Sequence, residues 1–275
     1  IEGNLVIISY LNTSWGSQAP GRHRYFAFDK NTGEVIWVST PGGPPKDTTY
    51  SVPIVTTING RRLLIAGNAD GSVYAMDIRT GKSVWKFALS KQRGLNASVV
   101  ADGHLIYASH GEENIDNTVM GRVVCIDGRG DGDITRTHEV WRVDGCQAGY
   151  SSPALHDGRL YVVDHSANLY AFDSKTGDQY WIHNIGTVGK GSPIWADGKI
   201  YVTEVNGHFH ILSVGPSGVK VASTVQLKVN ENTKKIEKRK QRYAEIYGSP
   251  AVANGRIFFT TEEGIYCLGY SKQAP

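Results

Sequence analysis

The chain has 275 residues with a formal net charge of only +3, and it contains 32 glycines, 14 tyrosines and 6 tryptophans. This length suits one all-β domain with a sizeable core, and so small a net charge predicts no nucleic-acid partner. No apolar run approaches the roughly 18 residues that a membrane-spanning helix needs, so the sequence also predicts no membrane span.

A motif that starts at Ala27 and ends at Trp37 reads Ala-Phe-Asp-Lys-Asn-Thr-Gly-Glu-Val-Ile-Trp. It returns at residues 75–85 and 171–181, where Asp and Trp are again eight residues apart. An Asp side chain can accept a hydrogen bond from the backbone two residues on, and Gly tolerates positive φ, so Asp-x-x-Thr-Gly predicts a tight turn between two strands. Repetition at this interval is typical of solenoids and propellers.

Six repeated units follow one another, at approximately 1–39, 40–88, 89–143, 144–183, 184–222 and 243–270. A complete unit opens with a Ser-x-Pro-like segment and an inner strand, turns at Asn-Gly or Asp-Gly, and continues through three more strands, the last two joined by the Thr-Gly turn. The first unit lacks its inner strand and the sixth stops after its third strand, so we expect further blades upstream of Ile1. Together the units predict a single β-propeller domain over 1–275, with 228–242 as a charged, mobile loop.

The tryptophan of the outer strand is predicted to anchor each blade against the next blade. Alanine at Trp37, Trp85 or Trp181 should therefore lower the free energy of unfolding by about 3–5 kcal/mol. Cys125 and Cys267 occupy the position that alanine fills in other units. This position predicts small buried residues rather than a disulfide or a metal site.

The Ala-x-Asp-x-x-Thr-Gly-x-x-x-Trp units with their Ser-x-Pro segments resemble the repeats of pyrroloquinoline-quinone (PQQ) proteins, and the resemblance covers essentially the whole chain. It extends to the non-enzymatic, BamB-like branch of this PQQ-like propeller family. The resemblance implies an all-β propeller of four-stranded antiparallel blades, with seven or eight blades in the full ring. It also implies a periplasmic or otherwise extracytoplasmic location.

Two functions from different classes are open at this point. No Ser-His-Asp arrangement, phosphate-binding Gly loop or Cys/His metal spacing stands out, which favours a non-catalytic propeller without a cofactor. Such a propeller would bind a protein partner, or a small ligand such as a sugar or peptide, as a scaffold or sensor. The alternative is a PQQ- and calcium-dependent quinoprotein dehydrogenase that oxidises an alcohol or a sugar. The resemblance would then imply a bound quinone, a calcium ion and an Asp base, but the adjacent cysteine pair of alcohol-oxidising members is missing from the sequence.

The predicted binding surface is the face that carries the long loops after the second and outer strands. Function tends to lie on loops held by a rigid scaffold, and these loops are 11–23, 40–50, 110–120, 144–150 and 223–247. Three residues before the Pro position of each unit lie Tyr50, Asn96, Tyr150, Lys190 and Tyr247. They are predicted to ring the mouth of the central channel and to hold a partner, or a planar or anionic ligand, by stacking and charge. The alternative is that the tyrosines only pack the channel mouth.

Two acidic segments are candidate metal sites, with a plain polar loop as the alternative for each. His110, Glu112 and Asp116 combine an imidazole with carboxylates within seven residues and could ligate a divalent metal. Residues 127–133 read Asp-Gly-Arg-Gly-Asp-Gly-Asp and partly match a calcium loop. However, Arg129 stands at the third position, where an oxygen ligand is expected.

Overall fold

The computed structural model describes residues 1–11, 22–229 and 243–269, and over these residues the chain is built from strands and turns. It divides into two compact units, the first made of Ile1–Pro153 with Lys175–Gly177 and the second of Ala154–Ser174 with Asp178–Pro275. The expectation of one domain over 1–275 stays a prediction. In the described part of the chain, no helix has the length and apolar character needed to cross a membrane.

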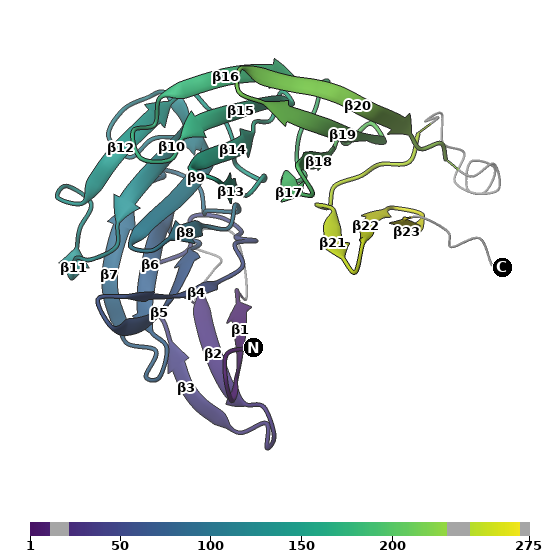
Figure 1. Cartoon of the computed structure of the whole chain (residues 1–275). Coiled ribbons are helices and arrows are strands. Elements are labelled where there is room, and N and C mark those ends of the chain that lie inside the picture. Colours follow the sequence, from purple (N-terminus) through teal and green to yellow (C-terminus); the bar gives the residue numbers. More distant parts are fainter. Residues whose placement is uncertain (12–21, 230–242, 270–275) are drawn as a thin grey trace. The chain divides into compact units, whose positions relative to one another are not determined.

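The first unit contains three sheets whose strands follow the order of the sequence from inner to outer strand, with one short added strand as the exception (Figure 1). The first sheet is β1 (Leu5–Tyr10), β2 (Arg24–Asp29) and β3 (Val35–Ser39). The second is β4 (Ile54–Ile58), β5 (Arg61–Gly67), β6 (Ser72–Asp77) and β7 (Ser83–Ala88), with the short β11 (Gly132–Asp133) added at the edge of β7. The third is β8 (Val100–Asp102), β9 (Leu105–Glu113), β10 (Met120–Asp127) and β12 (Glu139–Asp144).

The second unit repeats this arrangement in three more sheets. The fourth sheet is β13 (Ala154–His156), β14 (Arg159–Val163), β15 (Asn168–Asp173) and β16 (Gln179–Asn184). The fifth is β17 (Ile194–Ala196), β18 (Lys199–Thr203), β19 (His208–Gly215) and β20 (Gly218–Gln226). The sixth is β21 (Ala251–Ala253), β22 (Arg256–Thr261) and β23 (Gly264–Leu268). The prediction of six antiparallel units, the first and last of them incomplete, is therefore confirmed for the described residues.

Of the five Asn-Gly or Asp-Gly pairs that follow an inner strand, four form the expected hairpin turn. Positive φ at both central residues is the signature of a type I′ turn, and it is found at Asn59-Gly60, Asp157-Gly158, Asp197-Gly198 and Asn254-Gly255. The turn at Asp102 is shifted by one residue, because Asp102 pairs with Leu105 and the loop is Gly103-His104. There Gly103 has positive φ and His104 does not, which corresponds to a type II′ turn.

Tryptophans of the outer strands β3 and β7 dock the first sheet onto the second and the second onto the third, as predicted. Trp37 donates its Nε1–H to the Ile78 carbonyl at 3.0 Å, and Trp85 donates to the Gly128 carbonyl at 2.9 Å. In both cases the acceptor directly follows the Asp that ends the third strand of the next sheet, Asp77 or Asp127. The core lies between successive sheets: Trp85, for example, packs in one buried cluster with Ile106 of the following sheet.

The glycine of the Thr-Gly turn serves both the turn and the docked tryptophan. Gly81 has φ of 68°, and a Cβ built there would lie 2.6 Å from the Trp37 ring, whereas Gly33, with φ of 76°, has open space around it. We therefore expect Gly33→Ala to cost about 1–2 kcal/mol for positive φ alone. Gly81→Ala should cost a further 1–3 kcal/mol or so, since the added methyl displaces the indole. Urea unfolding of the two variants measures the difference; equal losses would contradict the contact.

The long connection between β10 and β12 of the third sheet has a role that the sequence did not reveal. Its strand β11 pairs parallel with β7, with Gly132 opposite Trp85 and Asp133 opposite Lys86. Ile134 directly follows and is 1% exposed in the same core cluster as Trp85. Through β11 and Ile134 this connection therefore attaches the third sheet to β7, the outer strand of the second sheet.

Two expectations about local structure were wrong. Cys125 is buried as predicted, but Cys267 is exposed, since β23 is the last strand of its sheet and Ile265 on it is 79% exposed. The loops expected over 110–120 and 223–247 are partly strand, because β9 continues to Glu113 and β20 continues to Gln226. Most of the predicted charged loop, residues 230–242, lies outside the described residues.

Candidate interaction surface

The five predicted mouth residues occupy equivalent places in the structure. Tyr50, Asn96, Tyr150, Lys190 and Tyr247 each lie four residues before an inner strand, namely β4, β8, β13, β17 and β21. The tyrosines present much of their surface to solvent, with exposed fractions of 65% for Tyr50, 44% for Tyr150 and 51% for Tyr247. Each tyrosine therefore has contact area to offer that its own sheet does not bury.

The backbone behind these side chains is held by serines of the Ser-x-Pro segments. In the first unit the Val52 N–H donates to Ser98 Oγ, and the Ser98 N–H donates to Ser152 Oγ, both at 2.9 Å. In the second unit the Ser192 N–H donates to Ser249 Oγ at 2.8 Å. Each of these serines thus joins its own repeat to the preceding repeat, which explains why serine recurs at this position.

Two of the mouth residues contact each other. The Lys190 ammonium lies 5.0 Å from the centre of the Tyr247 ring, a cation–π distance. The Tyr247 hydroxyl donates to Glu245 at 2.7 Å, and this hydrogen bond raises the pKa of Tyr247. Asn96 has a buried Oδ1 atom with no hydrogen-bond partner among the described residues. The Lys190–Tyr247 pair is a feature that can recognise a polar partner, whereas the Asn96 Oδ1 atom is buried and is not presented to one.

The first candidate metal segment is engaged in internal contacts. His110 is 2% exposed; its Nε2 pairs with Asn114 Oδ1 at 2.8 Å, and its Nδ1 accepts the Glu112 N–H at 3.3 Å. Burial lowers the pKa of His110 to about 4. Both ring nitrogens are therefore engaged in hydrogen bonds, and the contact with Glu112 is made by its backbone N–H rather than by its carboxylate.

Asp116 belongs to an arginine cluster instead. It pairs with Arg142 and, at 2.7 Å, with Arg122, whose side chain is only 1% exposed. Arg122 also pairs with Asp144 through Nε at 2.6 Å. Although burial by itself would raise the pKa of Asp116, the hydrogen bonds from the two arginines outweigh it and lower the pKa to about 2.

The calcium-like loop does not fit a calcium ion either. Asp127 pairs with Arg129 at 2.5 Å, Asp131 with Arg61 at 2.8 Å, and Asp133 accepts the Thr135 hydroxyl at 2.6 Å. Carboxylates turned toward cations and hydroxyls of their own chain do not converge on one point. Among the residues described, no group of three or more His, Cys, Asp or Glu side chains is placed to hold a metal ion.

Two groups of hydrogen-bonded, buried polar side chains were not predicted from the sequence. Ser9 Oγ lies 2.7 Å from His23 Nε2, and His23 Nδ1 contacts the Asn68 amide oxygen, which joins the first two sheets. In the second unit Glu204 is 1% exposed and lies 3.0 Å from His210 Nε2. Partners up to 45 residues apart leave no local signal in a sequence.

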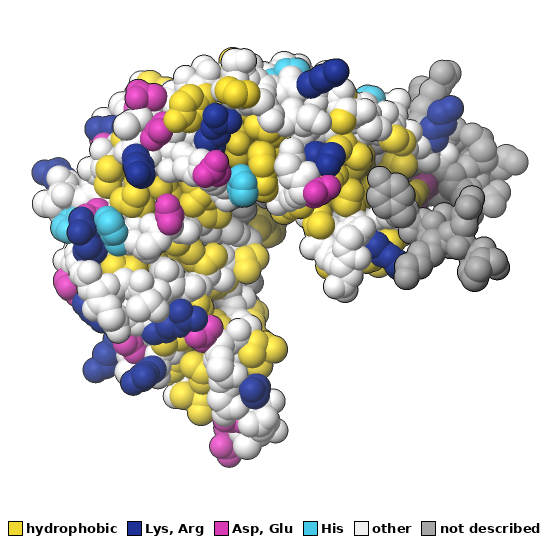
Figure 2. Space-filling view, viewed as in Figure 1, with side chains coloured by type: hydrophobic (Ala, Val, Ile, Leu, Met, Phe, Trp, Pro, Cys, Tyr) yellow, Lys and Arg dark blue, Asp and Glu magenta, His cyan; other side chains and the backbone are white. Residues whose placement is uncertain are grey.

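The charges of the described surface are mixed in sign. On the face shown in Figure 2, basic and acidic side chains are interspersed. Large single-sign fields are what attract nucleic acid. The visible surface agrees in this respect with the small net charge of the chain.

Repeated antiparallel sheets, ordered from inner to outer strand and docked through tryptophans, define the blades of a PQQ-like β-propeller protein. The family model described as outer membrane protein assembly factor BamB matches residues 2–183 and 133–273. The chain therefore belongs to this family.

Individual relatives are distant. The outer membrane protein assembly factor BamB of Kangiella koreensis is 26% identical over 193 residues, covering 68% of this chain and 45% of that protein. The serine/threonine-protein kinase AfsK of Streptomyces coelicolor is 29% identical over 154 residues, 50% of this chain and 18% of the kinase. The crystal structure of BamB from Moraxella catarrhalis aligns with a TM-score of 0.69 at 17% identity, over 97% of this chain and 70% of that chain, which shows the fold alone. The chain thus spans less than half the length of these two curated relatives.

Proposed function

We propose that this chain is a non-catalytic, extracytoplasmic propeller segment that holds a protein partner through Tyr50, Tyr150 and Tyr247. The supporting observation is that these tyrosines recur four residues before an inner strand and are all exposed. Tyrosine is enriched at protein interfaces because it offers a large apolar ring with a polar tip. Membership of the BamB family supports a role in protein assembly. Seven or eight blades in the full ring and a periplasmic location belong to the same proposal.

The alternative, a PQQ- and calcium-dependent dehydrogenase, is tested by titration. The purified protein would be titrated with PQQ and calcium while tryptophan fluorescence and dye-linked oxidation of alcohols and sugars are followed. We expect neither quenching nor turnover, since the acidic segments are engaged in ion pairs and hydrogen bonds of their own chain. Micromolar binding with turnover would replace the scaffold proposal with an enzyme.

Alanine at Tyr50, Tyr150 and Tyr247 together should reduce partner capture about tenfold or more, because tyrosine is enriched among the interface residues whose truncation costs about 2 kcal/mol or more. The measurement is quantitative mass spectrometry of proteins retained by the immobilised chain from periplasmic extract. The matched control is Tyr180→Ala, a tyrosine on β16 with 47% exposure. Unchanged capture by the triple variant, or an equal loss in the control, would count against these tyrosines as the binding surface.

A further inference from the structure

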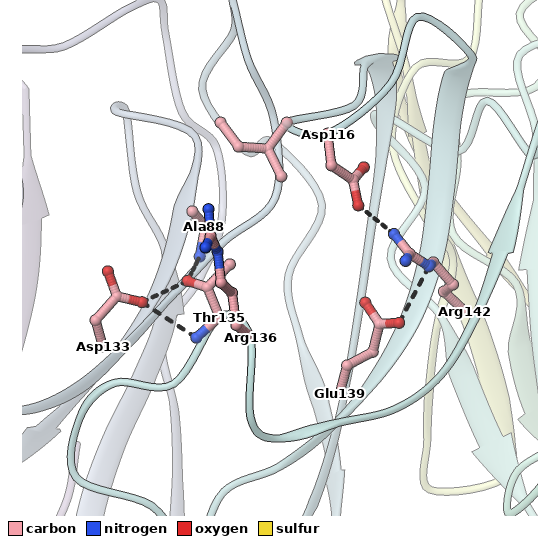
Figure 3. A pocket seen from close by; sticks show the side chains of 8 residues that line it. Ala88, Asp116, Asp133, Thr135, Arg136, Glu139 and Arg142 are labelled. Carbon is pink, nitrogen blue, oxygen red and sulfur yellow. Dashed lines mark hydrogen bonds and ion pairs between the residues drawn. The ribbon is translucent and has the colours of Figure 1, made fainter.

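A pocket of about 660 Å³ lies between the outer strands of the second and third sheets, within the first unit (Figure 3). One wall is the end of β7 at Ala88, and the other is formed by Glu139 and Arg142 on β12. Its remaining lining comes from the hairpin that follows β9 and from the β11 insertion. None of the predicted mouth residues lines it.

Both ends of the pocket are fixed to the outer strand region of the second sheet. At one end the Ile134 N–H donates to the Lys86 carbonyl at 2.9 Å. At the other end the Ile115 N–H donates to the Leu89 carbonyl at 3.1 Å. Because backbone hydrogen bonds hold both ends, a ligand would find the pocket already formed, which lowers the entropy lost on binding.

The carboxylates of the pocket are already satisfied. Asp116 pairs with Arg142, and Glu139 lies 3.1 Å from the same arginine, as the dashed lines of Figure 3 show. Asp133 accepts hydrogen bonds from the Thr135 hydroxyl at 2.6 Å and the Thr135 N–H at 3.1 Å. These acidic groups therefore have little capacity left to attract a cation.

Arg136 differs from every other charged residue of this lining. Among the described residues, its guanidinium has no hydrogen bond or ion pair, and Figure 3 shows it beside Thr135 without a dashed line. Five donors in a planar fork are suited to a carboxylate. Ile115, which is 38% exposed, adds an apolar surface to the same pocket.

We propose that this pocket binds an acidic segment of a partner polypeptide. A Glu or Asp carboxylate accepts hydrogen bonds from Arg136, and an aliphatic neighbour in the segment packs on Ile115 and Ala88. A carboxylate is favoured at this place because, among the described residues, Arg136 is the charged group of the lining for which no counter-ion is found. This site is separate from the tyrosines of the proposed scaffold surface, so either can fail without the other.

The test uses two fluorescein-labelled peptides, Gly-Ser-Glu-Leu-Glu-Gly-Ser and the same peptide with Gln in place of Glu, in anisotropy titrations at low ionic strength. We expect the Glu peptide to bind about tenfold more tightly than the Gln peptide, and added salt to weaken only the former. Arg136→Gln should weaken binding of the Glu peptide about tenfold, and Ile115→Ser should weaken both peptides. Because Arg136 is exposed, its replacement should leave the thermal midpoint unchanged.

The matched control is Arg79→Gln, another exposed arginine without a side-chain partner among the described residues, which should bind the Glu peptide like the parent. The triple tyrosine variant should also bind it like the parent. Equal affinity for the two peptides, no loss in Arg136→Gln, or the same loss in Arg79→Gln would each overturn the proposal.

Discussion

Replacing Trp85 with alanine is expected to lower the free energy of unfolding by about 3–5 kcal/mol, among the largest losses from a single core truncation. The Trp85 side chain is 1% exposed and packs in a cluster that includes Ile106 and Val124 of the next sheet. Its removal leaves a cavity between two sheets and deprives the Gly128 carbonyl of its 2.9 Å hydrogen bond. Urea unfolding followed by far-ultraviolet circular dichroism measures the loss, and a change below 1 kcal/mol would show that Trp85 does not anchor the sheet.

A pair of phenylalanine variants separates packing from hydrogen bonding. Trp181 is 7% exposed, but its Nε1–H has no acceptor among the described residues. The residue equivalent to the acceptors Ile78 and Gly128 is Val214, and this residue pairs with Val219 in the β19–β20 ladder. Trp85→Phe should therefore cost about 1 kcal/mol more than Trp181→Phe, which is the typical net value of one hydrogen bond. Equal costs would contradict a stabilising role for the Nε1–carbonyl bond.

The repeat allowed the sheets, most hairpin turns and the docked tryptophans to be predicted, because these depend on interactions within a unit or on one residue type at a fixed interval. Strand β11 escaped prediction since only two residues pair, and their partners on β7 lie 47 positions away in the sequence. The exposure of Cys267 could not be read from its repeat position, because burial depends on what packs over a strand rather than on the strand itself.

The places of the candidate residues within their repeats were predictable from the sequence, but the contacts of their side chains were not. Counting back from the Pro position located five equivalent residues, yet the Lys190–Tyr247 contact joins residues 57 positions apart. His110 looked like a loop ligand in the sequence, whereas the structure extends β9 past it and buries its ring. Arg122 gave no signal at all, since a buried arginine is recognisable only when its two carboxylate partners are seen together.

The arginine cluster leads to the second large effect, expected for the double variant Asp116→Asn with Asp144→Asn. Arg122 is 1% exposed and relies on these two carboxylates at 2.6–2.7 Å. Removing both leaves a buried guanidinium without a counter-ion, so the free energy of unfolding should fall by about 3–5 kcal/mol. Adding Arg122→Met to the double variant should restore part of this loss, because a methionine in that place needs no counter-ion.

The same cluster predicts an acid-dependent loss of stability. Since the pKa of Asp116 in the folded chain is about 2, below its usual value near 4, its ion pairs stabilise the fold fully above pH 4, and this contribution is lost as the pH falls toward 2. Urea unfolding between pH 7 and pH 3 should show a shallower decline for the Arg122→Met triple variant than for the parent. Arg129→Met serves as the control, since the exposed Arg129–Asp127 pair is screened by solvent and should change the decline little. If Arg122→Met deepened the loss of the double variant, the guanidinium would stabilise the fold through its packing rather than through its charge.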